Sequence, residues 1–224
     1  MKMKKLFILD VDGTTLDTIE TITYYVNRTL IQAKLEPVTS SEIAQLMGYS
    51  SRYLIEHAMA LRGFEVTDEK IDEAMDYYHA CYQSDVTYMT KAYEGILEMI
   101  EEIKAGGHVV VALSNKPDHT LQIIFDKMDL NKDFDFVLGQ KDELPKKPDP
   151  AMVYDIMERF GIARESTWFI GDTEVDFETA ENASVNFIGV SYGFRSKEQM
   201  QALNPEYLFD DVASMRDFII EEVI

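Results

Sequence analysis

The N-terminal segment KLFILDVDGTTLD, residues Lys5 to Asp17, gives the clearest indication of the fold. Its first half, KLFILD, is a short apolar run bounded by charge, and a turn that contains glycine follows it. Such a run is typical of a β-strand that is buried on both faces. We therefore expect a strand at Lys5–Asp10, with polar residues at its carboxyl end.

The same pattern returns along the chain. It recurs in HVVVALSN from His108, FDFVLG from Phe134, STWFIGD from Ser166 and VNFIGVSYG from Val185. Segments with helical periodicity lie between these runs, at Gly95–Lys104, His119–Met128 and Ala151–Phe160. Strands that alternate with helices predict the α/β class, with a Rossmann-like, doubly wound parallel sheet that binds ligands outside the carboxyl ends of its strands.

Residues Thr18 to Met89 break this alternation. Four segments suit helices and no comparable strand lies among them: Ile19–Ile31, Ser41–Met47, Ser51–Leu61 and Asp68–Tyr82. Ser40 or Ser41, and Thr67 or Asp68, are plausible N-caps. The sequence therefore predicts an α/β core made of residues 1–16 and 91–224, with an all-helical domain inserted at residues 17–90.

The chain is strongly acidic. Its 224 residues include 41 Asp and Glu against 21 Lys and Arg, which gives a formal charge of -20. Nucleic acid and anionic membrane surfaces are bound through clustered Lys and Arg, so we expect neither as a partner. A small phosphate ester remains compatible with this charge if cations gather at one site.

The remaining composition indicates a protein of the reducing cytoplasm. Cys81 is the lone cysteine, so no intramolecular disulfide forms, and no Cys/His zinc cluster is present. The apolar run after the first lysines is too short for a signal peptide, and no stretch approaches the ~18 apolar residues that cross a bilayer. We expect a cytoplasmic monomer or homodimer.

Two carboxylates follow the first strand. Asp10 and Asp12 are two residues apart, so on an extended backbone they point the same way. Close carboxylates repel each other unless a cation or a proton lies between them, which indicates a metal site or a shared proton. Taken alone, the pair is equally compatible with a solvated turn.

Three further strand ends carry polar groups. Ser114 and Asn115 offer a hydroxyl and an amide to a phosphoryl oxygen, or cap the next helix. Lys147 lies among prolines in KKPDP and offers a fixed positive charge. Asp172 and Asp176, in GDTEVD, are four residues apart at the expected start of a helix, where carboxylates are also favoured by the helix dipole alone.

Taken together, DVDGTTLD, Ser114, Lys147-Pro148 and GDTEVD resemble the four signature motifs of the haloacid dehalogenase superfamily, in order and over nearly the whole chain. The resemblance implies that Asp10 is a nucleophile that forms an aspartyl-phosphate, and that Asp12 is the acid and then the base. It implies that Ser114 and Lys147 hold the phosphoryl oxygens. Halide-displacing members need no acid at position 12, so Asp12 favours phosphoryl chemistry.

The resemblance also implies a Mg²⁺ site and a substrate site. Asp10, the backbone carbonyl of Asp12, and Asp172 would bind Mg²⁺, with Asp176 close by. Gly13, Thr14 and Asn115 would surround the phosphate, Gly13 because it lets the backbone leave the strand sharply. This implied set completes the catalytic and metal residues that we expect.

The helical insertion resembles the cap domain of the phosphoglycolate phosphatase and β-phosphoglucomutase branch. GYSSR, residues 48–52, is similar to the substrate-facing loop of such caps, so Tyr49 or Arg52 is expected to contact the distal part of the substrate. The segment from Gly189 to Met215, which includes Gly193, resembles phosphoglycolate phosphatases. At Ala183-Ser184 the chain departs from the glycine that relatives usually carry, which leaves that turn open.

The expected function is hydrolysis of a small phosphomonoester such as phosphoglycolate, a sugar phosphate or a nucleotide. A β-phosphoglucomutase-like isomerase is the nearest alternative, because it would use the same aspartyl-phosphate. A catalytically silent protein that keeps the fold is an alternative of another class. A dinucleotide-dependent dehydrogenase is disfavoured because no G-x-G-x-x-G follows the first strand.

Overall fold

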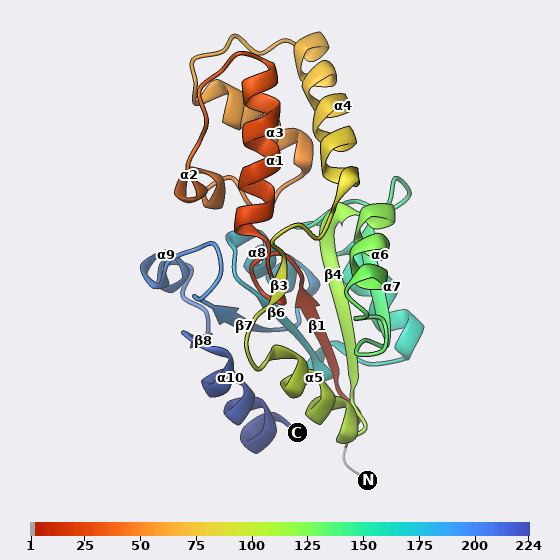
Figure 1. The fold of residues 1–224 in the computed structure, drawn as a ribbon. Helices are drawn as coiled ribbons and strands as arrows, with labels where there is room; N and C mark the ends of the chain where they lie inside the picture. The colour runs from red at the N-terminus through yellow and green to blue at the C-terminus, as the bar shows by residue number, and fades with distance from the viewer. Residues whose placement is uncertain (1–2) are drawn as a thin grey trace.

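The protein was analysed as a computed structural model, which describes residues 3–224. Its centre is a six-stranded parallel sheet in the order β5-β4-β1-β6-β7-β8 (Figure 1). The strands are β1 (Leu6–Asp10), β4 (Val109–Pro117), β5 (Phe136–Gln140), β6 (Thr167–Gly171), β7 (Asn186–Val190) and β8 (Tyr207–Phe209). The predicted α/β class and the five predicted strands are confirmed.

Both faces of the sheet are covered, as its apolar strands require. Phe7 and Leu9 of β1 pack on the side of α5 (Ile96–Ala105), α6 (Asp118–Lys127) and α10 (Val212–Phe218). Leu6 and Ile8, which alternate with them, pack on the side of α7 (Ala151–Phe160), α8 (Glu174–Ala183) and α9 (Lys197–Ala202). Successive side chains of a strand point to opposite faces, so every residue of β1 is buried. Two short helical turns, Arg164–Ser166 and Ile219–Val223, complete the core.

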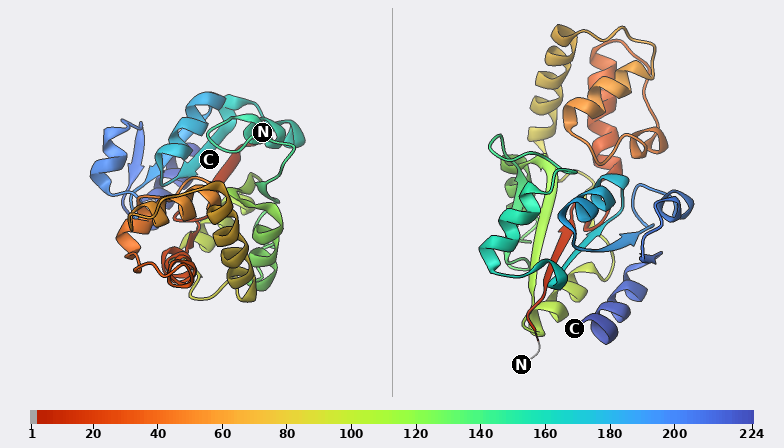
Figure 2. Two further views of the ribbon diagram at one scale, coloured as in Figure 1. Left: turned by 90° about the horizontal axis from the view of Figure 1, so that it is seen from above. Right: turned by 180° about the vertical axis from the view of Figure 1, so that it is seen from behind.

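The four helices near the N-terminus stand over one end of the sheet (Figures 1 and 2). They are α1 (Ile19–Gln32), α2 (Ser40–Ala44), α3 (Ser51–Ala60) and α4 (Asp68–Ser84). The chain enters and leaves them through β2 (Leu16–Asp17) and β3 (Lys91–Ala92), which pair antiparallel. The sequence predicted connections at these places, whereas the predicted division into two domains stays a prediction.

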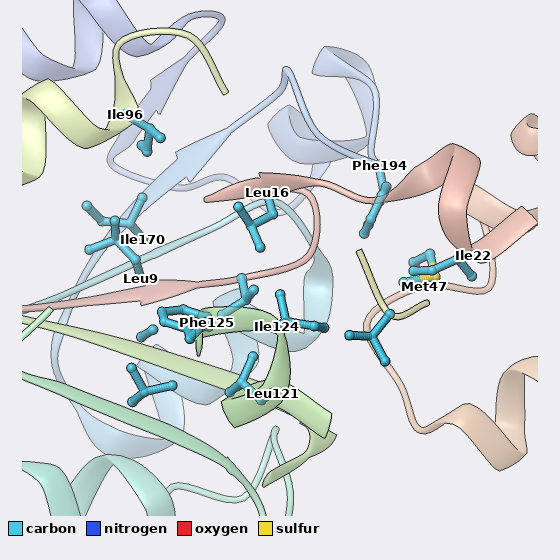
Figure 3. Close-up of a cluster of buried hydrophobic side chains, with 14 of the residues drawn as sticks. Leu9, Leu16, Ile22, Met47, Ile96, Leu121, Ile124, Phe125, Ile170 and Phe194 are labelled. Atoms are coloured by element: carbon cyan, nitrogen blue, oxygen red, sulfur yellow. The ribbon is translucent and has the colours of Figure 1, made fainter. Parts of the chain in front are cut away.

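Buried apolar side chains run without a break from the sheet into the helical region. Leu9 and Leu16 belong to the same cluster as Ile22 of α1 and Met47, which follows α2 (Figure 3). Phe194, from the loop after β7, lies between the two parts of this cluster. The helical region is therefore packed onto the sheet end in this structure.

Three local features refine what the sequence indicated. Helix α2 ends at Ala44 and is capped by Thr39, whose side chain forms a capping box with Glu42. Strand β4 continues to Pro117, so Ser114 and Asn115 lie inside the strand and do not cap α6. Ser184 adopts the left-handed conformation, with φ of 55°, that a glycine usually takes at the end of a helix. Within residues 3–224, no helix is long and apolar enough to span a membrane.

Candidate active site

Asp10 is the last residue of β1 and its carboxylate lies in a buried cluster of charges. The Lys147 ammonium donates a hydrogen bond to Asp10 Oδ1 at 2.6 Å and a second one, also at 2.6 Å, to Asp176 Oδ1. The Lys147 side chain is only 3% exposed. Two carboxylates that share one buried ammonium are held at fixed positions, which preorganises Asp10 at the sheet end.

Asn115 fixes the backbone of Lys147. Its side-chain oxygen accepts from Lys147 N–H at 2.8 Å, and its amide donates to the Lys147 carbonyl at 3.0 Å and to the Gly48 carbonyl at 3.0 Å. Asn115 therefore joins β4, the KKPDP segment and the loop before α3. The structure brings Asn115 into the predicted site, where its side-chain amide forms these hydrogen bonds and positions the backbone of Lys147.

Three buried carboxylates gather at this place. Asp10, Asp172 and Asp176 each offer an oxygen, and these oxygens lie within 4.8 Å of one another. Burial, with repulsion from Asp176, raises the pKa of Asp10 to about 7 against the opposing effect of Lys147. Burial and the neighbouring Asp176 and Asp10 likewise raise the pKa of Asp172 well above its usual value.

This donor set fits a divalent cation. The buried Lys147 pairs with two of the three carboxylates, Asp10 and Asp176, so the repulsion within the cluster is incompletely offset by this lysine. Hard cations such as Mg²⁺ take oxygen ligands and bring the positive charge that such a cluster lacks. The cluster can therefore bind a metal, as the sequence predicted for these three residues.

The backbone closes tightly around Asp172. Thr14 Oγ1 donates to Asp172 Oδ1 at 3.1 Å and Phe194 N–H donates to Asp172 Oδ2 at 2.6 Å. A Cβ atom at Gly13, where φ is +92°, would lie 2.3 Å from Asp172 Oδ2, and one at Gly193 would lie equally close. Both positions therefore require glycine, and they hold the carboxylate in one orientation.

Asp12 faces a lysine that the sequence analysis missed. The Lys116 ammonium donates to both carboxylate oxygens of Asp12, each at 2.8 Å. Burial alone would lower the pKa of Lys116, but the facing Asp12 carboxylate outweighs it and the pKa is raised. Lys116 directly follows Ser114-Asn115, and this position next to two predicted site residues was the only indication in the sequence that Lys116 belongs to the site.

A cavity of about 80 Å³ opens beside these residues, between the sheet end and the helical region. Of the predicted residues, Asp10, Asp12, Tyr49, Ser114, Asn115 and Lys147 line it. Arg52 does not line it: its guanidinium pairs with Asp72 at 2.5 Å and Asp68 at 3.2 Å. Its role in substrate binding stays a prediction, and this geometry gives it no support.

Arg195, in the loop after β7, was also missed. It forms two hydrogen bonds of 2.7 Å with Glu174 at the start of α8, and it donates to the carbonyls of Ala44 and Met47. Its side chain is 5% exposed. Arg195 thus joins the sheet-bearing part of the molecule to the loop that forms one wall of the cavity.

The protein has a doubly wound parallel sheet, with a buried carboxylate cluster and a lysine at the carboxyl end of its strands. This combination defines an α/β enzyme whose acidic site suits a metal ion. Comparison with protein families agrees with this class. The model of the haloacid dehalogenase-like hydrolases matches residues 7–190. The chain belongs to this family and is a hydrolase of it.

Relatives resemble the chain over nearly its full length. A phosphoglycolate phosphatase of Psychrobacter arcticus is 30% identical and covers 97% of this chain and 96% of its own. One of Agrobacterium fabrum is 27% identical, with 99% and 95% covered. A crystal structure from Lactobacillus delbrueckii subsp. bulgaricus superimposes with a TM-score of 0.92 at 25% identity, covering 98% of this chain and all of that one.

Proposed function

We propose that the protein is a Mg²⁺-dependent phosphatase that hydrolyses a small phosphomonoester through an aspartyl-phosphate on Asp10. The observation that carries the proposal is the buried arrangement in which Lys147 bridges Asp10 and Asp176 while Asp172 lies beside them. A carboxylate attacks an anionic phosphoryl group only where positive charge offsets their repulsion. Lys147 supplies part of that charge, and the carboxylate cluster suits the cation that supplies the rest.

In the first step, an Asp10 oxygen forms a bond to phosphorus while the ester P–O bond breaks. The leaving oxygen takes a proton from Asp12, whose carboxyl lies in the same cavity. In the second step, water gives a proton to Asp12 and attacks phosphorus, which releases inorganic phosphate and restores the Asp10 carboxylate. Covalent catalysis thus divides one difficult hydrolysis into two steps.

The other residues position the reacting groups. Lys147 binds phosphoryl oxygens, and Ser114, whose hydroxyl accepts from Lys116 N–H at 3.1 Å, lines the cavity and can donate its own proton to a phosphoryl oxygen. Asp10, the Asp12 carbonyl and Asp172 would hold the metal, with Asp176 nearby. When bound, Mg²⁺ supplies positive charge that neutralises the transferring phosphoryl group. Gly13 and Thr14 act on the phosphate indirectly, because both orient Asp172.

Phosphoglycolate is the proposed substrate. The relatives described above carry the name phosphoglycolate phosphatase, which favours a phosphatase over a mutase. The cavity between the sheet end and the helical region measures about 80 Å³. This size favours a small ester over a nucleotide.

The test is phosphate release from phosphoglycolate, sugar phosphates, nucleotides and a chromogenic ester, with and without Mg²⁺. Mg²⁺-dependent turnover that is highest for phosphoglycolate supports the proposal. Turnover that does not respond to metal removal contradicts the proposed cofactor. Isomer formation without phosphate release would instead identify a mutase.

A further inference from the structure

Lys116 is the second lysine of the cavity, and the proposed mechanism does not use it. Lys147 is engaged with Asp10 and Asp176 at the phosphoryl end. Lys116 comes from the end of β4 and lies on the other side of Asp12, with 9% of its side chain exposed. This buried ammonium has three donors, so while it contacts both Asp12 oxygens it can also donate to the part of the substrate that leaves.

Tyr82 of α4 faces the same part of the cavity. Its side chain is 5% exposed, and among residues 3–224 its hydroxyl makes no well-formed hydrogen bond, although the Lys116 ammonium lies close enough to act on it. The Lys116 ammonium lies 5.5 Å from the centre of the Tyr82 ring. Buried hydroxyl groups are normally hydrogen-bonded, so one without a well-formed bond in a cavity wall indicates a place for a ligand atom. A charged donor and a neutral donor thus lie together at this wall.

The distances restrict where the ligand atom sits. Asp12 would hydrogen-bond the leaving oxygen, and Lys116 Nζ lies 2.8 Å from both Asp12 oxygens. A group bound by Lys116 is therefore close to the ester oxygen along the substrate. A carboxylate on the neighbouring carbon places an oxygen about 3 Å from the ester oxygen, from ordinary bond lengths, which suits this reach.

We propose that Lys116 and Tyr82 form a subsite that binds the carboxylate of a 2-phosphooxy carboxylic acid, next to Asp12. The inference rests on the proposed function and assigns the residues that would select its substrate.

The rest of the lining agrees with a single carboxylate at this subsite. Arginine, which binds phosphate with two parallel hydrogen bonds, is absent from the described residues that line the cavity. The remaining wall is largely apolar, with Ile22, Leu54 and Tyr78 among its residues. Ser50 and Ser51, at the start of α3, also line the cavity, where a helix N-terminus favours negative charge. These features favour a small monoanionic group over a second phosphate or a neutral sugar.

The experiment compares phosphoglycolate with ethyl phosphate, which lacks only the carboxylate function. In Lys116→Met, kcat/KM should fall about 10- to 100-fold more for phosphoglycolate than for ethyl phosphate, the range that hydrogen bonds to charged groups contribute. Tyr82→Phe should lower kcat/KM about 2- to 10-fold for phosphoglycolate alone. Compared with Lys116→Met, Lys116→Arg should restore part of the preference for phosphoglycolate over ethyl phosphate. Lys104→Met removes a lysine of α5 outside the cavity and should change kcat/KM for neither substrate.

The ratio of kcat/KM for the two substrates distinguishes a carboxylate subsite from other roles of Lys116. Equal losses on both esters in Lys116→Met would mean that Lys116 only orients Asp12, which overturns the subsite. A wild-type protein that hydrolyses ethyl phosphate as well as phosphoglycolate overturns it too, while leaving the proposed phosphatase intact. Absence of Mg²⁺-dependent hydrolysis with any ester, the chromogenic one included, overturns both.

Discussion

At the scale of single residues, the orientation of Asp172 depends on two glycines. In Gly13→Ala, the new methyl group would lie 2.3 Å from Asp172 Oδ2 on a backbone with φ of +92°. Displacing a catalytic-site group by about 1 Å costs on the order of 100-fold in rate, and we expect a loss of this size in kcat/KM, with weaker Mg²⁺ activation.

Gly161→Ala is the matched control for Gly13→Ala. Gly161 also has a positive φ, of +62°, but no atom within 4 Å of the added Cβ. This control should lose roughly 1 kcal/mol of stability and keep full activity. Normal kinetics in Gly13→Ala would show that Asp172 needs no such restraint.

Mutual repulsion among the buried carboxylates gives a prediction that does not involve turnover. Saturating Mg²⁺ at about 100 times its Kd should stabilise the wild type by about 2.7 kcal/mol, measured by urea unfolding with Mg²⁺ or with a chelator. Asp172→Asn should abolish this stabilisation. It should also make the metal-free protein more stable, because one of three neighbouring buried negative charges is removed. A wild type indifferent to Mg²⁺ would disprove the metal site.

At the scale of elements, the end of α8 carries strain that a substitution can remove. Ser184 has φ of 55° and ψ of 47°, and its backbone N–H caps the helix. Left-handed conformations cost residues other than glycine about 1–2 kcal/mol. Ser184→Gly should therefore raise the free energy of unfolding by roughly 1 kcal/mol, while Ser184→Val should lower it. Thermal and urea unfolding of the two variants measure this difference, and equal stabilities would contradict the argument.

The strands were predictable because each is an uninterrupted apolar run, and a buried parallel sheet requires such runs. The start of α2 was placed one residue late because the capping box of Thr39 and Glu42 was overlooked, and its end was placed three residues too far. Charge pairs between distant elements left no local signal. Lys116 and Asp12 are 104 residues apart in sequence, and Arg52 is held by acidic residues of α4 that the loop motif does not reveal.

The acidic cluster could be predicted from the positions of polar residues relative to the strands. The sequence placed polar residues at four strand ends, and parallel topology brings the carboxyl ends of strands to one edge. The contact between the helical region and that edge depends on side chains from several elements. Its details, such as the partners of Arg195, follow from tertiary packing and from no single motif.

At the scale of the whole molecule, Arg195 connects the two parts that enclose the cavity. Arg195→Ala should free the loop that contains Met47, Gly48 and Tyr49, and should raise KM about tenfold, the equivalent of one hydrogen bond to a charged group. The Arg216–Glu102 pair has similar geometry, with hydrogen bonds of 3.0 Å and 2.7 Å, but lies away from the cavity. Arg216→Ala should leave KM unchanged, whereas equal KM values in both variants would show that Arg195 has no part in shaping the site.

We infer that Asp10 becomes phosphorylated during turnover, and mass spectrometry can detect this phosphorylation. The protein is mixed with phosphoglycolate and Mg²⁺, quenched in acid within the first turnovers and digested. We expect the mass of one phosphoryl group on the peptide that contains Asp10, and we expect this added mass to be absent in Asp10→Asn and absent without Mg²⁺. Turnover of phosphoglycolate by Asp10→Asn at the wild-type rate, with no phosphorylated peptide in either protein, would contradict this inference.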